Sequence, residues 1–206
     1  VNMLLVSFGT RPEYIKIKPL LEEFDGKIPY ALLFTGQHTS LLEKVIDTTD
    51  IRRLKIHDGP NRLDSIVSSI MNNDHVFNDI TAVMVQGDTT SAFAVGLAAF
   101  HRQIKVIHLE AGLRTWDLDN PYPEEFNRQS ISRLASIHLC PTDVSEANLR
   151  RENITNGLHI VGNTVLDNIR NVDSVYGNTI LVTLHRRENH STMNQWFSEL
   201  DTLAKE

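Results

Sequence analysis

Continuous apolar runs alternate with amphipathic helical stretches along most of the chain, and this alternation limits the possible folds more than any other feature of the sequence. Unbroken apolar runs are typical of strands that are covered on both faces. Helices between such strands indicate βαβ units and a parallel sheet with helices on both faces. We therefore predict an α/β fold. The expected strands are residues 3–8, 31–35, 82–86, 105–109, 137–140, 158–161 and 179–184.

A polar segment at residues 171–178 divides this pattern into two parts. After it, the chain supplies one expected strand and one expected helix, which cannot bury a core alone. We therefore predict a first domain at residues 1–170 and the start of an incomplete second domain at residues 171–206. The expected helices are residues 13–24, 41–45, 63–71, 91–101, 124–135, 145–151 and 192–205.

Composition and charge argue against several classes of protein. The formal net charge is −6 and no basic stripe is present, so nucleic-acid binding is not expected. No apolar run reaches 18 residues, so no transmembrane helix is expected. The single Cys140 cannot form an internal disulfide and suits a reducing compartment. Neither zinc-ligand spacing nor an acidic calcium loop occurs. We expect a soluble cytoplasmic protein without a metal ion.

Ligands of open α/β sheets lie beyond the carboxyl ends of the strands, and unusual polar residues follow the expected strands here. The first strand leads into Gly9-Thr10-Arg11-Pro12-Glu13, and Lys16 follows on the next helix. Helix-start amides together with Arg11 and Lys16 favour an anion such as a diphosphate. The segment matches neither G-x-G-x-x-G nor a P-loop. A capped helix with a solvated Arg11 and Lys16 is an equally good interpretation.

Single residues after the next strands allow two interpretations each. His38 follows the second strand and is either a ligand or acid/base group, or a surface histidine in a turn. Asp88 is either a site carboxylate or the N-cap of the helix after it.

The segments farther along the chain are less easily explained by structure alone. Glu110 and Arg114 lie in 108–115, where an ordinary turn requires neither residue type, which indicates a carboxylate held in a cleft. Glu124 begins a helix after a proline-stiffened loop, where a carboxylate also interacts favourably with the helix dipole. His185 and Arg186 could meet a phosphate or form a charged loop.

Five of these segments, in this order, resemble the non-hydrolysing UDP-N-acetylglucosamine 2-epimerases. The resemblance implies Rossmann-like domains in a GT-B-like two-domain architecture, with the nucleotide sugar held between the domains. It also implies interconversion of UDP-GlcNAc and UDP-ManNAc without NAD or metal, and a homodimer in the full-length form. The segments are Gly9-Thr10-Arg11-Pro12-Glu13, Gln86-Gly87-Asp88-Thr89-Thr90, His108-Leu109-Glu110-Ala111-Gly112-Leu113-Arg114-Thr115, Pro123-Glu124-Glu125 and His185-Arg186-Arg187-Glu188-Asn189.

The same resemblance assigns roles to residues of this chain. It implies that UDP contacts Arg11, Lys16 and His185, and that the carboxylates surround the sugar. The substrate-binding candidates are Arg11, Lys16, His38, Arg114 and Arg186. The catalytic candidates are Asp88, Glu110, Glu124 and His185.

Family members are much longer than 206 residues. We therefore expect a fragment that lacks half of the cleft, and a purified 206-residue protein without epimerase activity. Two other interpretations remain: a related enzyme of the same fold, either a glycosyltransferase or a hydrolysing epimerase, and a non-catalytic fragment that binds a nucleotide sugar or a partner.

Overall fold

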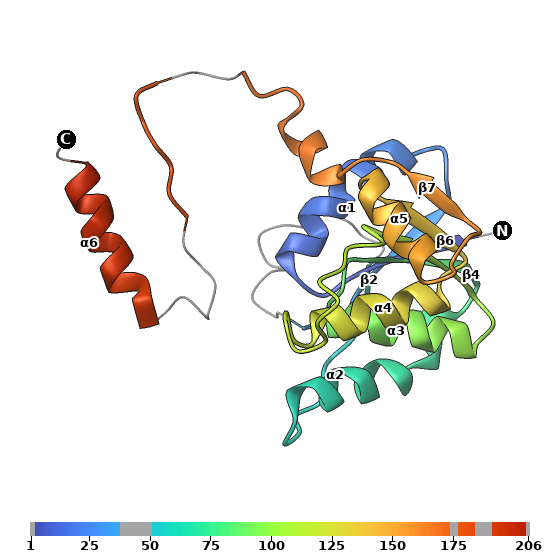
Figure 1. Cartoon of the computed structure of the whole chain (residues 1–206). Helices are drawn as coiled ribbons and strands as arrows, with labels where there is room; N and C mark the ends of the chain where they lie inside the picture. The colour runs from blue at the N-terminus through green and yellow to red at the C-terminus, as the bar shows by residue number, and fades with distance from the viewer. Residues whose placement is uncertain (1–2, 38–50, 174–176, 184–190, 205–206) are drawn as a thin grey trace. The chain divides into compact units, whose positions relative to one another are not determined.

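The computed structural model describes residues 3–37, 51–173, 177–183 and 191–204. The chain divides into two units, Val1–Asn171 and Val172–Glu206. In the described part of the first unit, seven strands form one sheet in which every pair of neighbours is parallel (Figure 1). The strands are β1 (Met3–Phe8), β2 (Tyr30–Phe34), β3 (Ile51–Arg53), β4 (Ile80–Gln86), β5 (Lys105–Leu109), β6 (Ile137–Cys140) and β7 (Leu158–Ile160).

Helices cover both faces of this sheet (Figure 1). On one face, strand residues such as Leu33 and Val83 pack with Ile66 and Ile131 of the helices. On the other face, Val6 and its neighbours pack against α1. The fold class expected from the apolar runs is therefore confirmed. The helices of the first unit are α1 (Arg11–Phe24), α2 (Arg62–Met71), α3 (Thr90–His101), α4 (Glu124–Leu134) and α5 (Asp143–Arg151), with 3₁₀ turns η2 (Asp74–Phe77) and η3 (Thr164–Ile169).

The strand order β3-β2-β1-β4-β5-β6-β7 reverses direction between β1 and β4. The chain leaves β1 toward one edge of the sheet and returns to β4 on the other side of β1. At such a switch point the loops after the two strands diverge and leave a crevice that commonly holds a ligand. The loop before α3 carries the candidate Asp88, and α1 begins with Arg11 and carries Lys16.

The strand predictions need correction at two places, one strand that was missed and one that does not form. The short β3 was not predicted, because two of its three residues are arginines and no apolar run marks it. The expected strand at 179–184 is wrong for residues 179–183, which adopt no strand. A strand needs a hydrogen-bonding neighbour, and the described part of the second unit offers none. The expected helix at 41–45 lies outside the described residues.

The second unit contains α6 (Met193–Leu203), which forms most of the helix expected at 192–205. The apolar residues described in the second unit are largely exposed, both before α6 (Ile180 and Leu181) and on it (Trp196). That residues 171–206 begin a second domain stays a prediction. Across the described residues of both units, no helix is long and apolar enough to span a membrane.

Candidate active site

The loop between β1 and α1 closes on a buried carboxylate of its own helix. Glu13 is only 2% exposed, and its Oε2 accepts hydrogen bonds from the amides of Gly9 (2.9 Å) and Thr10 (2.7 Å) and from the Thr10 hydroxyl (2.8 Å). This is a capping interaction in which the anion at the helix start comes from the chain itself. The amides of Gly9 and Thr10 are therefore engaged within the fold, and the binding of an anion by the helix-start amides stays a prediction.

Glu13 also joins this loop to the loop after β4. Its Oε1 accepts a hydrogen bond of 2.7 Å from the Thr89 hydroxyl, which in turn accepts one of 3.0 Å from the Ala92 amide. Thr89, not Asp88, is thus the N-cap of α3. The alternative in which Asp88 caps the helix is wrong, because the neighbouring hydroxyl fills that place. The Asp88 carboxylate is left for contacts across the site.

Asp88 lies among charged groups from three other segments. Its Oδ2 is 2.7 Å from Nη2 of Arg128, which belongs to α4. Burial raises the pKa of Asp88, and repulsion from Glu110 and Glu124 raises it further, while Arg128 and Lys16 act in the opposite direction. Lys16, Glu110 and Glu124 are thus the charged groups that surround Asp88 together with Arg128, and the four residues Lys16, Asp88, Glu110 and Glu124 form one electrostatic cluster.

Glu110 follows β5 and forms the centre of a second set of contacts. Its Oε1 and Oε2 are 2.8 Å and 2.6 Å from Nζ of Lys16, and Gln86 Nε2 donates a hydrogen bond to Oε2. The residue has a φ of +66°, which is costly for a side chain other than glycine and is often found at functional sites. Lys16 and Glu110 are thus joined directly, although 94 positions separate them.

Arg114 does not join this cluster. Its side chain is fully buried, with Nε hydrogen bonded to Glu152 and Nη2 to the Ser132 hydroxyl at 2.9 Å. Nη1 donates to the carbonyl of Leu113 at 2.7 Å. Within the described residues, each of the three Arg114 guanidinium nitrogens therefore has a partner in the fold. Its predicted contact with substrate stays a prediction that this geometry does not support.

Of the four remaining candidate site residues, the structure describes only Arg11. Arg11 is exposed in the first turn of α1. The predicted site residues His38, His185 and Arg186 lie outside the described residues. In the described part of the chain, no group of three or more His, Cys, Asp or Glu side chains is arranged to hold a metal ion.

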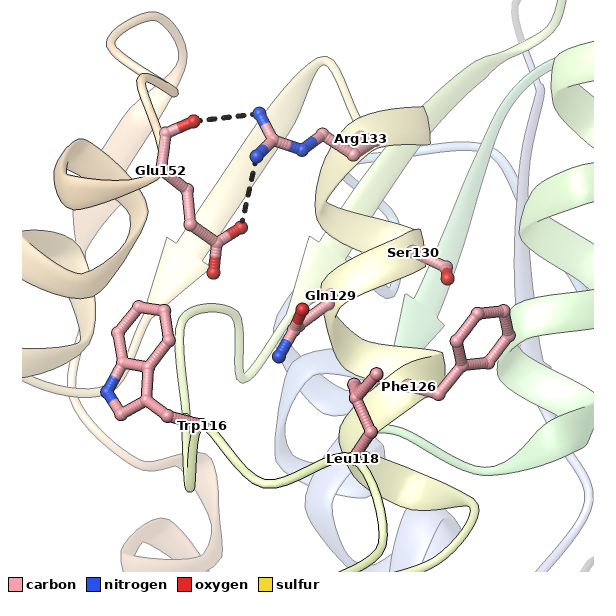
Figure 2. A pocket seen from close by; sticks show the side chains of 7 residues that line it. All are labelled: Trp116, Leu118, Phe126, Gln129, Ser130, Arg133 and Glu152. Carbon is pink, nitrogen blue, oxygen red and sulfur yellow. Dashed lines mark hydrogen bonds and ion pairs between the residues drawn. The ribbon is translucent and has the colours of Figure 1, made fainter.

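A shallow pocket of about 360 Å³ lies elsewhere on the first unit, and no candidate site residue lines it. Figure 2 shows Arg133 turned toward Glu152 on one side, with Nη1 donating to the Glu152 carbonyl at 2.8 Å. The other side is apolar and exposed. The pocket is lined by Trp116, Leu118, Phe126, Gln129, Ser130, Arg133 and Glu152.

Sequence reasoning missed Gln86, Asn127 and Arg128, which contact the candidate carboxylates or their loops. A signal for two of them was present. Residues 124, 127 and 128 are spaced i, i+3 and i+4, so a helix that begins at Glu124 presents all three on one face.

Comparisons with known proteins show which family this chain resembles. A family model described as UDP-N-acetylglucosamine 2-epimerase matches residues 22–206. The UDP-N-acetylglucosamine 2-epimerase of Salmonella borreze is 39% identical over 94% of this chain. The structure of UDP-GlcNAc 2-epimerase from Neisseria meningitidis bound to UDP-GlcNAc is 36% identical, with a TM-score of 0.74 over 82% of this chain. A complex of the Methanocaldococcus jannaschii enzyme with UDP-GlcNAc and UDP is 30% identical, with a TM-score of 0.73 over 82% of this chain.

These similarities cover only part of each relative. The chain spans 59% of the length of the Salmonella borreze protein, and 51% and 49% of the two solved chains. Over this span, the expected Rossmann-like fold of the GT-B-like 2-epimerases is confirmed.

Proposed function

The chain belongs to the UDP-N-acetylglucosamine 2-epimerase family, and from this premise we propose that the natural polypeptide carrying it interconverts UDP-GlcNAc and UDP-ManNAc. The observation that carries the proposal is the cluster of Lys16, Asp88, Glu110 and Glu124 beside the switch point of the sheet. Three carboxylates and a cation at this place suit a reaction that moves protons and releases a diphosphate.

The chemistry explains why carboxylates are needed. The proton on C2 of the sugar is not acidic, because C2 carries no neighbouring carbonyl. When the bond between C1 and the UDP oxygen breaks, C1 becomes oxocarbenium-like, and a carboxylate can then remove the C2 proton. The products are a glycal and UDP. A proton added to the opposite face of C2, with return of UDP to C1, gives the epimer.

The proposed roles follow from the charges of the cluster. Asp88, Glu110 and Glu124 would exchange protons with the two faces of C2, together with His185. Burial raises the pKa of Asp88, so this carboxyl is suited to hold a proton closer to neutral pH than an exposed aspartate. Arg11 and Lys16 would stabilise the departing diphosphate. His38 and Arg186 are the further proposed substrate contacts, whereas the contact of Arg114 stays a sequence-based prediction because its guanidinium is engaged within the fold.

Two other functions would use the same cluster. A hydrolysing epimerase or glycosyltransferase of this fold would also cleave the bond between C1 and UDP, but would pass the sugar to water or to an acceptor. A non-catalytic protein would bind the nucleotide sugar without exchanging a proton. The fate of the C2 proton and of UDP distinguishes all of these.

The test is incubation of the natural polypeptide with UDP-GlcNAc in D₂O, followed by proton NMR. The expected product is UDP-ManNAc with deuterium at C2, because removal and return of the C2 proton pass through groups that exchange with solvent. Free ManNAc with stoichiometric UDP would instead indicate a hydrolysing enzyme. Binding of UDP-GlcNAc without deuterium uptake would indicate a non-catalytic protein, or a glycosyltransferase if UDP is released once a sugar acceptor is added.

We also propose a homodimer in the cytoplasm. The exposed apolar side chains Trp116, Leu118 and Phe126, which surround the pocket in Figure 2, support a protein interface on the first unit. The single cysteine, a buried free thiol, is consistent with a reducing compartment. Light scattering of the purified natural polypeptide measures the oligomeric state directly.

A further inference from the structure

Arg128 of α4 lies between the carboxylate of Asp88, a candidate catalytic residue, and the buried carboxylate of Glu125. Its Nη2 is 2.7 Å from Oδ2 of Asp88, and its Nε is 3.5 Å from Oε2 of Glu125. Only 12% of the Arg128 side chain is exposed, and the Glu125 side chain is fully buried. The guanidinium therefore has little freedom to turn away from Asp88.

Glu125 is fixed in turn by two amides of the loop before α4 and by one side chain of α4 itself. Its Oε2 and Oε1 each accept a hydrogen bond of 3.1 Å, from the amides of Thr115 and Trp116 respectively, and Oε1 accepts a further one of 2.8 Å from Gln129. Burial acts to raise the Glu125 pKa, but these three hydrogen bonds and the charge of Arg128 lower it overall. Glu125 thus faces Arg128 as a fixed negative charge.

A neighbouring residue holds the backbone of the same aspartate. Asn127, which is buried, donates a hydrogen bond of 2.9 Å from Nδ2 to the carbonyl oxygen of Asp88. Asn127 and Arg128 therefore hold Asp88 at two points, its main chain and its carboxylate. Because Glu124 begins the same helix, one rigid element carries a candidate catalytic group and the two residues that fix another.

We propose that Arg128, supported by Glu125, is a positioning residue that fixes the direction and the charge of the Asp88 carboxylate. The mechanistic part of this inference rests on the proposed function, whereas the contact with Asp88 does not. Without Arg128, the charged groups facing Asp88 in the described part of the chain are Glu110 and Glu124, which repel it, and Lys16, which already pairs with Glu110. Asp88 would then hold its proton more tightly and turn more freely.

The principal variant is Arg128→Met, which keeps a long apolar stem but removes the charge. Arg128→Lys keeps the charge without the planar, two-sided guanidinium. Arg133→Met is the matched control, because Arg133 lies on the same helix with 57% of its side chain exposed and pairs with Glu152 instead. All three are made in the natural polypeptide.

The first measurement does not depend on catalysis. The carboxyl carbon of Asp88, labelled with ¹³C and assigned by comparison with Asp88→Asn, is titrated by NMR. We expect the Asp88 pKa to rise in Arg128→Met, to rise less in Arg128→Lys and to stay unchanged in Arg133→Met. If Arg128→Met does not fold, the comparison of Arg128→Lys with wild type gives the same test.

The second measurement is the pH dependence of epimerisation. We expect kcat of Arg128→Met to fall by about 100-fold with little change in KM, since misplacement of a reacting group by about 1 Å has an effect of this size. The limb of the pH profile that reports Asp88 should move to higher pH, and Arg128→Lys should recover part of kcat. A purely structural role would lower the midpoint of thermal unfolding without moving that limb.

An unchanged Asp88 pKa in Arg128→Met would overturn the inference, as would equal losses of kcat in Arg128→Met and Arg133→Met. The two proposals can fail separately. If the wild-type polypeptide exchanges no C2 proton but Arg128→Met still shifts the Asp88 titration, the proposed function is wrong and the positioning of Asp88 stands. If the wild-type polypeptide is an epimerase and Arg128→Met does not shift the Asp88 titration, the proposed function stands and the positioning of Asp88 is wrong.

Discussion

Gly112, two residues after Glu110, is the position at which the smallest possible substitution should do the most harm. It has a φ of +86°, and a Cβ atom placed on it would lie 2.1 Å from the carbonyl oxygen and 2.7 Å from the carbonyl carbon of Ser145. Both atoms belong to the backbone of α5, so no side chain can turn aside to make room. Asn148 fixes the same place by donating a hydrogen bond of 3.0 Å to the Gly112 carbonyl.

The magnitude has two parts. A left-handed conformation costs an alanine about 1–2 kcal/mol relative to glycine. Forcing an extra methyl group into a packed site costs a further ~1–3 kcal/mol. Gly112→Ala should therefore lower the free energy of unfolding by about 2–5 kcal/mol, a large part of the stability of a typical domain.

Gly162→Ala is the matched control for this variant. Gly162 has a φ of +83°, but nothing lies within 4 Å of the position where its Cβ would stand. The control should therefore show the conformational cost alone, about 1–2 kcal/mol. Urea denaturation followed by circular dichroism measures both variants against wild type. Equal losses of stability in the two variants would refute the reasoning, because the contact with Ser145 would then contribute nothing.

Two other buried groups give predictions of their own. Glu13→Ala should lower the free energy of unfolding by about 3 kcal/mol or more, because the Gly9 and Thr10 amides and the Thr89 hydroxyl lose their acceptor. Glu13→Gln should lower it less. Urea denaturation of both variants checks this order, and an equal loss would contradict it. Burial also raises the Glu13 pKa above its unfolded value, so its contribution to stability is complete below the unfolded pKa and is lost as pH rises through the folded pKa, a pH dependence that Glu13→Gln should remove. Burial lowers the pKa of His108 from 6.5 to about 3, against the hydrogen bond with the Gly87 carbonyl. The unfolded chain therefore binds the proton first, and stability should fall by up to about 1.4 kcal/mol per pH unit as pH drops below 6.5 toward 3; an NMR titration of the His108 ring with a midpoint near 6.5 would show this to be wrong.

Sequence patterns were sufficient for most regular elements of the first unit and for part of the site. Apolar runs predicted six of the seven strands described there, because each lies in a sheet whose faces are covered by helices. They did not predict β3, whose arginines give no such signal. They also predicted a strand at 179–184. A run of apolar residues shows that a segment can form a strand, but not whether a neighbouring strand is present to pair with it.

The site was less accessible to local patterns, because its contacts join distant segments. Lys16 pairs with Glu110, and Arg128 with Asp88, across 94 and 40 positions respectively. Their proximity depends on strand order, which a list of strands and helices does not contain. The same limit applies to Arg114: its charge is visible in the sequence, whereas its ion pair with Glu152, the residue that follows α5, is not.

The central claim is that the cluster of Lys16, Asp88, Glu110 and Glu124 serves epimerisation at C2. The most direct measurement is deuterium uptake at C2 when the natural polypeptide acts on UDP-GlcNAc in D₂O, compared between wild type and Asp88→Asn. We predict UDP-ManNAc with deuterium at C2 for wild type, and a loss of at least about 100-fold in its rate of formation for Asp88→Asn. Epimerisation at an undiminished rate in Asp88→Asn, or formation of UDP-ManNAc that retains the original C2 proton, would contradict the account.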